Sequence, residues 1–151
     1  MSVLNWLLDA DPAIRWQVLR DVLDERAEVI ADERARVANE GWGARLLALG
    51  DEDGQWAGGA CFPSRIRYQW DQEPGQPWIS TLPTLQLLYD FGIDPHAGHI
   101  VRRVALIQDH CRWEHAGNPF SAVRSSRASM AASSHWVLIL GSTWQTWSYV
   151  W

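Results

Sequence analysis

Helix start and stop signals divide most of this chain into short amphipathic segments. Two segments begin with an Asp-Pro pair, Asp11-Pro12 and Asp94-Pro95, in which an N-cap residue precedes proline at the first helical position. Three others are followed by glycine, at positions 41, 50 and 92, where glycine is typical of a helix C-terminus. The sequence shows no sustained alternation of apolar and polar residues of the kind that marks a strand. We therefore predict an all-α fold of paired helices.

Five helices are predicted, at 12–23, 28–40, 42–49, 82–90 and 95–110, and residues 2–8 form a short apolar lead-in. Short connections between the first three helices imply antiparallel neighbours. Apolar residues spaced by three or four positions indicate which helix faces point inward. In the first helix the predicted inward residues are Ile14, Val18, Leu19, Val22 and Leu23. In the last helix they are Ile100, Val101, Val104, Ala105 and Ile107.

The strongest motif of the chain lies between Gly41 and Gly59. Its short helix is followed by Gly50, and an acidic turn then leads to Gly54, Gln55 and Trp56. We predict that these last three residues form a structural turn between helices. From 54 to 81 the chain is rich in Gly, Pro, Gln and aromatic residues, which predicts a long irregular loop. Loops of this length within compact domains are usually functional or disordered.

Composition and charge restrict the class of protein. A chain of 151 residues with 47% hydrophobic residues is long enough for one domain with a buried core. Its net charge of -5 and its lack of a block of basic residues argue against a nucleic-acid partner or an anionic membrane surface. No apolar run approaches the roughly 20 residues of a membrane-spanning helix, and the first residues do not resemble an export signal. We therefore expect a cytoplasmic protein with no membrane span and with Cys61 and Cys111 as free thiols.

The 11 tryptophans allow two interpretations. Trp56, Trp70, Trp78 and Trp113 could line a pocket in which ring faces stabilise a carbocation or stack on a sugar. The alternative, which we favour for any single tryptophan, is a large ring that wedges helices together at their turns.

The histidines and cysteines do not predict a metal site. His96 and His99 lie one turn apart on a predicted helix, but their spacing matches no known zinc pattern, and Cys111 has no second cysteine at close range. The phosphate-loop and dinucleotide motifs are also missing from the sequence, as is a Ser/His/Asp order. We expect neither a metal nor a cofactor.

Two sets of carboxylates are candidates for a catalytic acid. Asp51, Glu52 and Asp53 follow a helix and precede glycine, and they lack the further oxygen ligands of a calcium loop, so we interpret them as turn residues. Glu114 follows Trp113, and a carboxyl group against aromatic bulk is a typical position for a general acid. Glu114 is therefore the candidate catalytic residue.

Residues 4 to about 120 resemble the bacterial squalene-cyclase-like proteins of the terpenoid cyclase and protein prenyltransferase α/α-toroid group. The resemblance rests on Asp11 to Asp21, on Gly41 to Leu49 with Asp53 to Trp56, on Thr84 to Leu88 and on Val104 to Glu114. The Gly54-Gln55-Trp56 turn is similar to the Gln-Trp repeats of that group, in which the turn joins one helical hairpin to the next.

This resemblance implies a partial α/α toroid over residues 1–120, in which paired helices enclose an apolar cavity. Trp56, Trp78 and Trp113 would line the cavity, Glu114 would be its acid, and an apolar small molecule or polyprenyl chain would be its ligand. The Asp-x-Asp-Asp motif of the cyclases and the zinc ligands of the prenyltransferases have no counterpart in this sequence. We therefore expect a truncated toroid protein that is not catalytic by itself. The alternative is a non-enzymatic helical-repeat module that binds a lipid, peptide or glycan in its concave face.

Residues 121–151 differ in composition from the rest of the chain. All 18 acidic residues lie before Ala116, whereas Ser121 to Trp151 holds eight Ser and four Trp. One interpretation is a strand or an apolar terminal segment at residues 136–140. The one we favour is an out-of-frame translation: in the shifted frame His135-Trp136 must encode Leu, Trp136-Val137 must encode Gly, and acidic residues become possible again. A toroid interrupted there would expose apolar faces and associate with itself or aggregate. A gene with no one-base change near the Phe120 codon and with no downstream frame that continues the family pattern would contradict this hypothesis.

Overall fold

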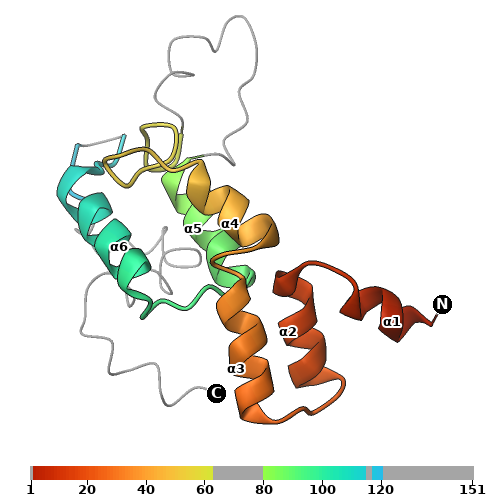
Figure 1. The fold of residues 1–151 in the computed structure, drawn as a ribbon. Coiled ribbons are helices and arrows are strands. Elements are labelled where there is room, and N and C mark those ends of the chain that lie inside the picture. The colour runs from red at the N-terminus through yellow and green to blue at the C-terminus, as the bar shows by residue number, and fades with distance from the viewer. Residues whose placement is uncertain (1, 63–79, 115–116, 121–151) are drawn as a thin grey trace, which may run out of the picture.

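A computed structural model describes residues 2–62, 80–114 and 117–120, and this part of the chain is helical (Figure 1). Its elements are α1 (Val3–Leu8), α2 (Pro12–Asp21), α3 (Ala27–Arg36), α4 (Gly41–Ala48), α5 (Thr81–Asp90) and α6 (Gly98–His110). Across the described residues no strand is formed, and the only β-type pairing is an isolated antiparallel bridge between Arg112 and Pro119. The predicted all-α fold is confirmed in these residues. The predicted tail, 121–151, lies outside them.

The five predicted helices are all present, and a sixth was missed. Residues 2–8, predicted as an apolar lead-in, contain α1, whose N-cap Ser2 accepts a hydrogen bond from the amide of Asn5. The helix predicted at 28–40 ends earlier, at Arg36. The one predicted at 95–110 begins later, at Gly98.

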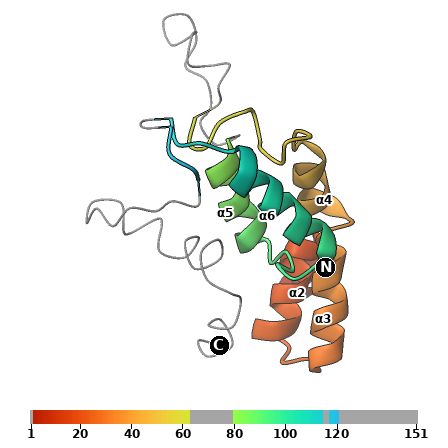
Figure 2. The ribbon, with the colours of Figure 1, turned by 90° about the vertical axis from the view of Figure 1, so that its left-hand side faces the viewer.

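α2 is at the centre of the helix packing. It forms an antiparallel hairpin with α3 and also contacts α1 and α4, and α4 packs in turn against α5 (Figure 1). α1 lies against α2 at the N-terminal side, and a second view shows α4, α5 and α6 above the α2 and α3 pair (Figure 2). No helix of the described part has both the length and the apolar content that crossing a bilayer demands.

One core is formed by α2, α5, α6 and the segments between the helices, and α1 contributes no buried residue to it. Its buried apolar residues are Trp16, Val37, Trp56, Ala60, Leu85, Leu88, Ile93, Ile100, Val104, Ile107, Cys111 and Phe120. In α6, the predicted inward residues Ile100, Val104 and Ile107 are buried, but Val101 is 43% exposed and Ala105 also faces solvent.

The predicted inward face of α2 was wrong at its C-terminal end. Val22 is 63% exposed and Leu23 is 37% exposed, because the helix ends at Asp21 and the chain turns away from the core. Trp16 takes the inward position instead, with 7% of its surface exposed. The large ring of Trp16 buries more apolar area at the centre of the helix than the two terminal side chains would.

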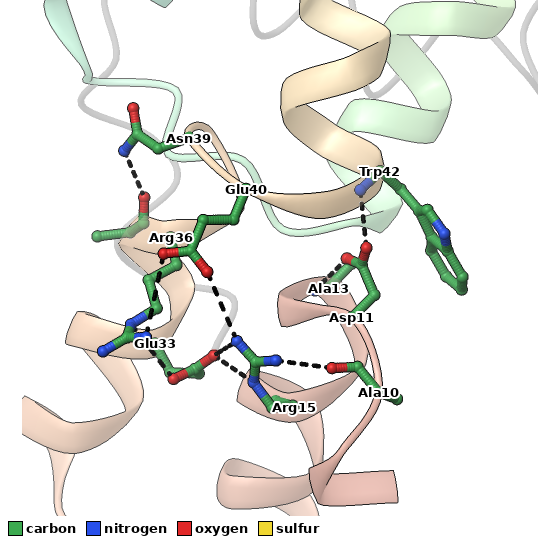
Figure 3. Close-up of polar contacts among 10 residues, drawn as sticks. Ala10, Asp11, Ala13, Arg15, Glu33, Arg36, Asn39, Glu40 and Trp42 are labelled. Atoms are coloured by element: carbon green, nitrogen blue, oxygen red, sulfur yellow. Dashed lines mark hydrogen bonds and ion pairs between the residues drawn. The ribbon is translucent and has the colours of Figure 1, made fainter.

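Asp11 caps two helices at once (Figure 3). Its Oδ1 accepts a hydrogen bond of 3.0 Å from the amide of Ala13 in the first turn of α2, and its Oδ2 accepts one of 2.7 Å from the amide of Trp42 in the first turn of α4. Gly41, at φ +64°, lies directly beneath the carboxylate, where a Cβ would overlap Oδ2. The negative charge therefore sits at the positive ends of two helix dipoles.

Ion pairs between α2 and α3 lie beside this cap (Figure 3). Arg15 donates from Nε to Glu33 Oε1 at 2.6 Å and from Nη1 to the carbonyl oxygen of Ala10 at 2.7 Å. Arg36 and Glu40 extend the pairing at 3.6 to 4.0 Å. Both Arg15 and Glu33 are largely buried, so this pair fixes the geometry of the hairpin more firmly than an exposed pair would.

Asp11→Ala is expected to lower the free energy of unfolding by roughly 2 kcal/mol, because it removes two caps worth about 1 kcal/mol each. Urea denaturation followed by circular dichroism measures the change. Asp9→Ala removes an exposed carboxylate two positions away and serves as the control. Equal stability of the two variants would show that Asp11 does not cap both helices.

Candidate functional site

The segment from Asp51 to Trp56 forms a closed turn after α4. The amide of Asp51 donates to the carbonyl oxygen of Gln55 at 2.8 Å, and the amide of Gly54 donates to the carbonyl oxygen of Asp51 at 3.0 Å. The Asp53 carboxylate accepts from the backbone amide of Gln55 at 3.0 Å and from its Nε2 at 2.6 Å. Asp53 is therefore bound within the turn by Gln55, which is only 8% exposed.

The turn contacts three helices. Trp56 Nε1 donates to the carbonyl oxygen of Leu46 in α4 at 2.8 Å, and its backbone amide donates to Thr81 Oγ1 in α5 at 3.1 Å. A Cβ on Gly54, which has φ +87°, would lie 2.8 Å from Leu106 Cβ and 3.0 Å from the carbonyl oxygen of Arg103 in α6. Trp56 itself is 2% exposed. The structure thus places Gly54, Gln55 and Trp56 where α4, α5 and α6 meet.

Trp56 is part of an arrangement that we term a tryptophan–arginine clamp. The Arg103 guanidinium lies over its ring, with Cζ 5.0 Å from the ring centroid. The same guanidinium covers Gly50, the residue after the C-cap of α4, where a Cβ would overlap Nη1. The clamp therefore has two parts. A buried tryptophan donates a hydrogen bond to the C-terminal end of a helix, and an arginine stacks on the tryptophan ring and covers the glycine that follows the helix.

A second clamp holds the C-terminal end of α5. Trp16 Nε1 donates to the carbonyl oxygen of Phe91, the C-cap of α5, at 2.8 Å. Arg34 lies over the Trp16 ring at 5.3 Å and donates from Nε to the carbonyl oxygen of Gly92 at 2.7 Å. A Cβ on Gly92, which has φ +86°, would overlap the Trp16 ring. The two clamps therefore share their residue types and their position at a helix end.

Trp113 and Glu114 lie in the hairpin that follows α6. The Trp113 ring stacks on Phe120, with centroids 4.8 Å apart, and the Trp113 amide donates to the carbonyl oxygen of Asn118 at 2.9 Å. Phe120 is 1% exposed. Trp113 itself is partly buried, and its ring packs against the core at Phe120.

The Glu114 carboxylate binds the backbone of Cys61 and Phe62. Its Oε1 accepts from the amides of Cys61 at 2.7 Å and Phe62 at 2.9 Å. The carbonyl oxygen of Cys61 accepts from Ser80 Oγ at 2.7 Å, and that of Ala60 accepts from the amide of Leu82 at 2.8 Å. Glu114 therefore fixes the point at which segment 59–62 meets the start of α5.

The structure brings together three of the predicted site residues, Trp56, Trp113 and Glu114, around the start of α5 and the end of α6. Trp78 and Trp70 lie outside the described residues. The sequence analysis missed Trp16 and Arg103. The signals that could have located them are Gly50 after α4 and Gly92 after α5, because Arg103 covers Gly50 and the Trp16 ring lies against Gly92.

Both cysteines belong to this region, and both are free. Burial raises the pKa of the Cys61 thiol from 9.0 to about 11, and the nearby Glu114 carboxylate contributes. Burial also raises the pKa of the Cys111 thiol to about 12, against the opposing effect of a hydrogen bond with Thr81. The part of the chain that the structure describes holds no group of three His, Cys, Asp or Glu side chains that could bind a metal ion.

At neutral to mildly alkaline pH, we expect alkylation by iodoacetamide to be slower for the folded protein than for the chain in concentrated guanidinium chloride, by roughly 100-fold at Cys61 and roughly 1,000-fold at Cys111. Each unit by which the pKa rises lowers the thiolate fraction about tenfold. Since the folded pKa values exceed the unfolded value of 9.0, the folded state keeps protons that the unfolded state loses. Stability therefore falls as the pH rises from about 9 toward the folded values of about 11 for Cys61 and about 12 for Cys111. Mass spectrometry of the single variants Cys61→Ser and Cys111→Ser assigns each rate. Equally fast labelling of folded and unfolded protein would contradict this prediction.

No protein-family model, curated protein or solved structure matches this chain.

Proposed function

We propose that this chain is a helical-hairpin module of the α/α-toroid type that binds an apolar ligand, such as a polyprenyl chain, and does not catalyse its conversion by itself. The observation that carries this proposal is the use of Trp56 and Glu114 as structural contacts, in the clamp at α4 and at the start of α5. The resemblance to squalene-cyclase-like proteins motivates the ligand class.

The repetition of the clamp supports a hairpin module. Trp16 with Arg34 and Trp56 with Arg103 each join a helix end to a helix from another part of the chain. Modules built from repeated helix pairs need such contacts, because one pair cannot bury its apolar face alone.

The bonding of Glu114 supports a role other than catalysis. A general acid must present its proton to the substrate. Glu114 Oε1 instead accepts two backbone N–H groups, which bind a carboxylate oxygen as an acceptor. These two bonds tie the carboxylate to the backbone at Cys61 and Phe62, which supports a structural use of Glu114.

Titration of the 151-residue chain with a fluorescent farnesyl diphosphate analogue tests the proposal, with squalene and inorganic pyrophosphate as competitors. We expect saturable binding that squalene displaces and pyrophosphate does not, and no new product by mass spectrometry. Absence of saturable binding would overturn the ligand class. Product formed by the wild type and by Asp109→Asn, an exposed carboxylate near the end of α6, but lost in Glu114→Gln, would overturn the non-catalytic role.

A further inference from the structure

We draw no further inference here: the strongest candidate, the side-chain cluster at the C-terminal end of α4 in which the buried Nη1 of Arg103 has no hydrogen-bond partner among the described residues, carries nothing because it belongs to the clamp already described and Gly50 closes Nη1 off from any ligand.

Discussion

Trp56→Ala is expected to lower the free energy of unfolding by about 3–5 kcal/mol, the usual cost of truncating a fully buried large aromatic residue. The variant loses the ring that packs in the core, the hydrogen bond to Leu46 and the surface on which Arg103 stacks. Because small domains are stable by only about 5–15 kcal/mol, this single change removes a large share of the total. Chemical denaturation followed by circular dichroism gives the value.

Trp6→Ala is the matched control, since Trp6 lies on α1 and is 63% exposed. Its expected effect is within about 0.5 kcal/mol. Trp56→Phe should fall between the two, because it keeps an aromatic ring but loses the indole N–H. If Trp56→Ala were as stable as Trp6→Ala, Trp56 would not be a wedge between helices, and its interpretation as a pocket-lining residue would regain support.

Gly54→Ala is expected to cost about 2–5 kcal/mol, as the sum of two effects. An alanine at φ +87° carries left-handed backbone strain of roughly 1–2 kcal/mol. Its Cβ would also lie 2.8 Å from Leu106 Cβ and 3.2 Å from the backbone nitrogen of Ile107, so α6 would have to move, and such overpacking costs about 1–3 kcal/mol.

Gly98→Ala provides the comparison for Gly54→Ala. Gly98 is the first residue of α6, and a Cβ there would approach only Arg102 Nη1, at 3.7 Å. Alanine favours a helix over glycine, so this variant should be as stable as the wild type or slightly more so. A Gly54→Ala variant with the stability of Gly98→Ala would mean that the turn does not lie against α6.

The helices could be predicted from the sequence because their signals are local. The Asp11-Pro12 pair begins α2, and glycine follows α4 and α5, as the capping preferences require. α1 escaped notice because six residues are too few to show a helical period.

The contacts of the site could not be predicted, because they join residues that are distant in the sequence. Trp16 bonds to Phe91, 75 positions away, and the face of α2 follows from that contact rather than from the spacing of its aliphatic residues. The sequence marks Glu114 as a candidate acid through its neighbour Trp113, and that neighbour gives no sign of the bonds from the Glu114 carboxylate to amides 52 and 53 positions away. The turn of Gly54, Gln55 and Trp56 could be expected from the sequence because its signals are local, whereas the helices that it contacts could not.

The same contacts explain how a short chain could fix the positions of its helices relative to one another. Each clamp bonds one tryptophan to a helix end and places an arginine where the helix dipole is negative. The ring excludes water from both interactions, which strengthens them. Tryptophan is thus used here for area and for its N–H group together, which fits its frequent position between helices.

The thermal unfolding of Glu114→Gln tests most directly whether this site is architecture or chemistry. If Glu114 acts through its bonds to Cys61 and Phe62, loss of its charge weakens two charge-assisted hydrogen bonds, at a cost of about 1–2 kcal/mol, and the Tm falls by roughly 3–6 °C. Asp109→Asn, which removes an exposed carboxylate on the last turn of α6, should leave the Tm unchanged. Catalytic groups are commonly held at a cost in stability, so replacing one leaves the Tm equal or higher. A Tm for Glu114→Gln at or above that of the wild type would contradict the structural role of Glu114.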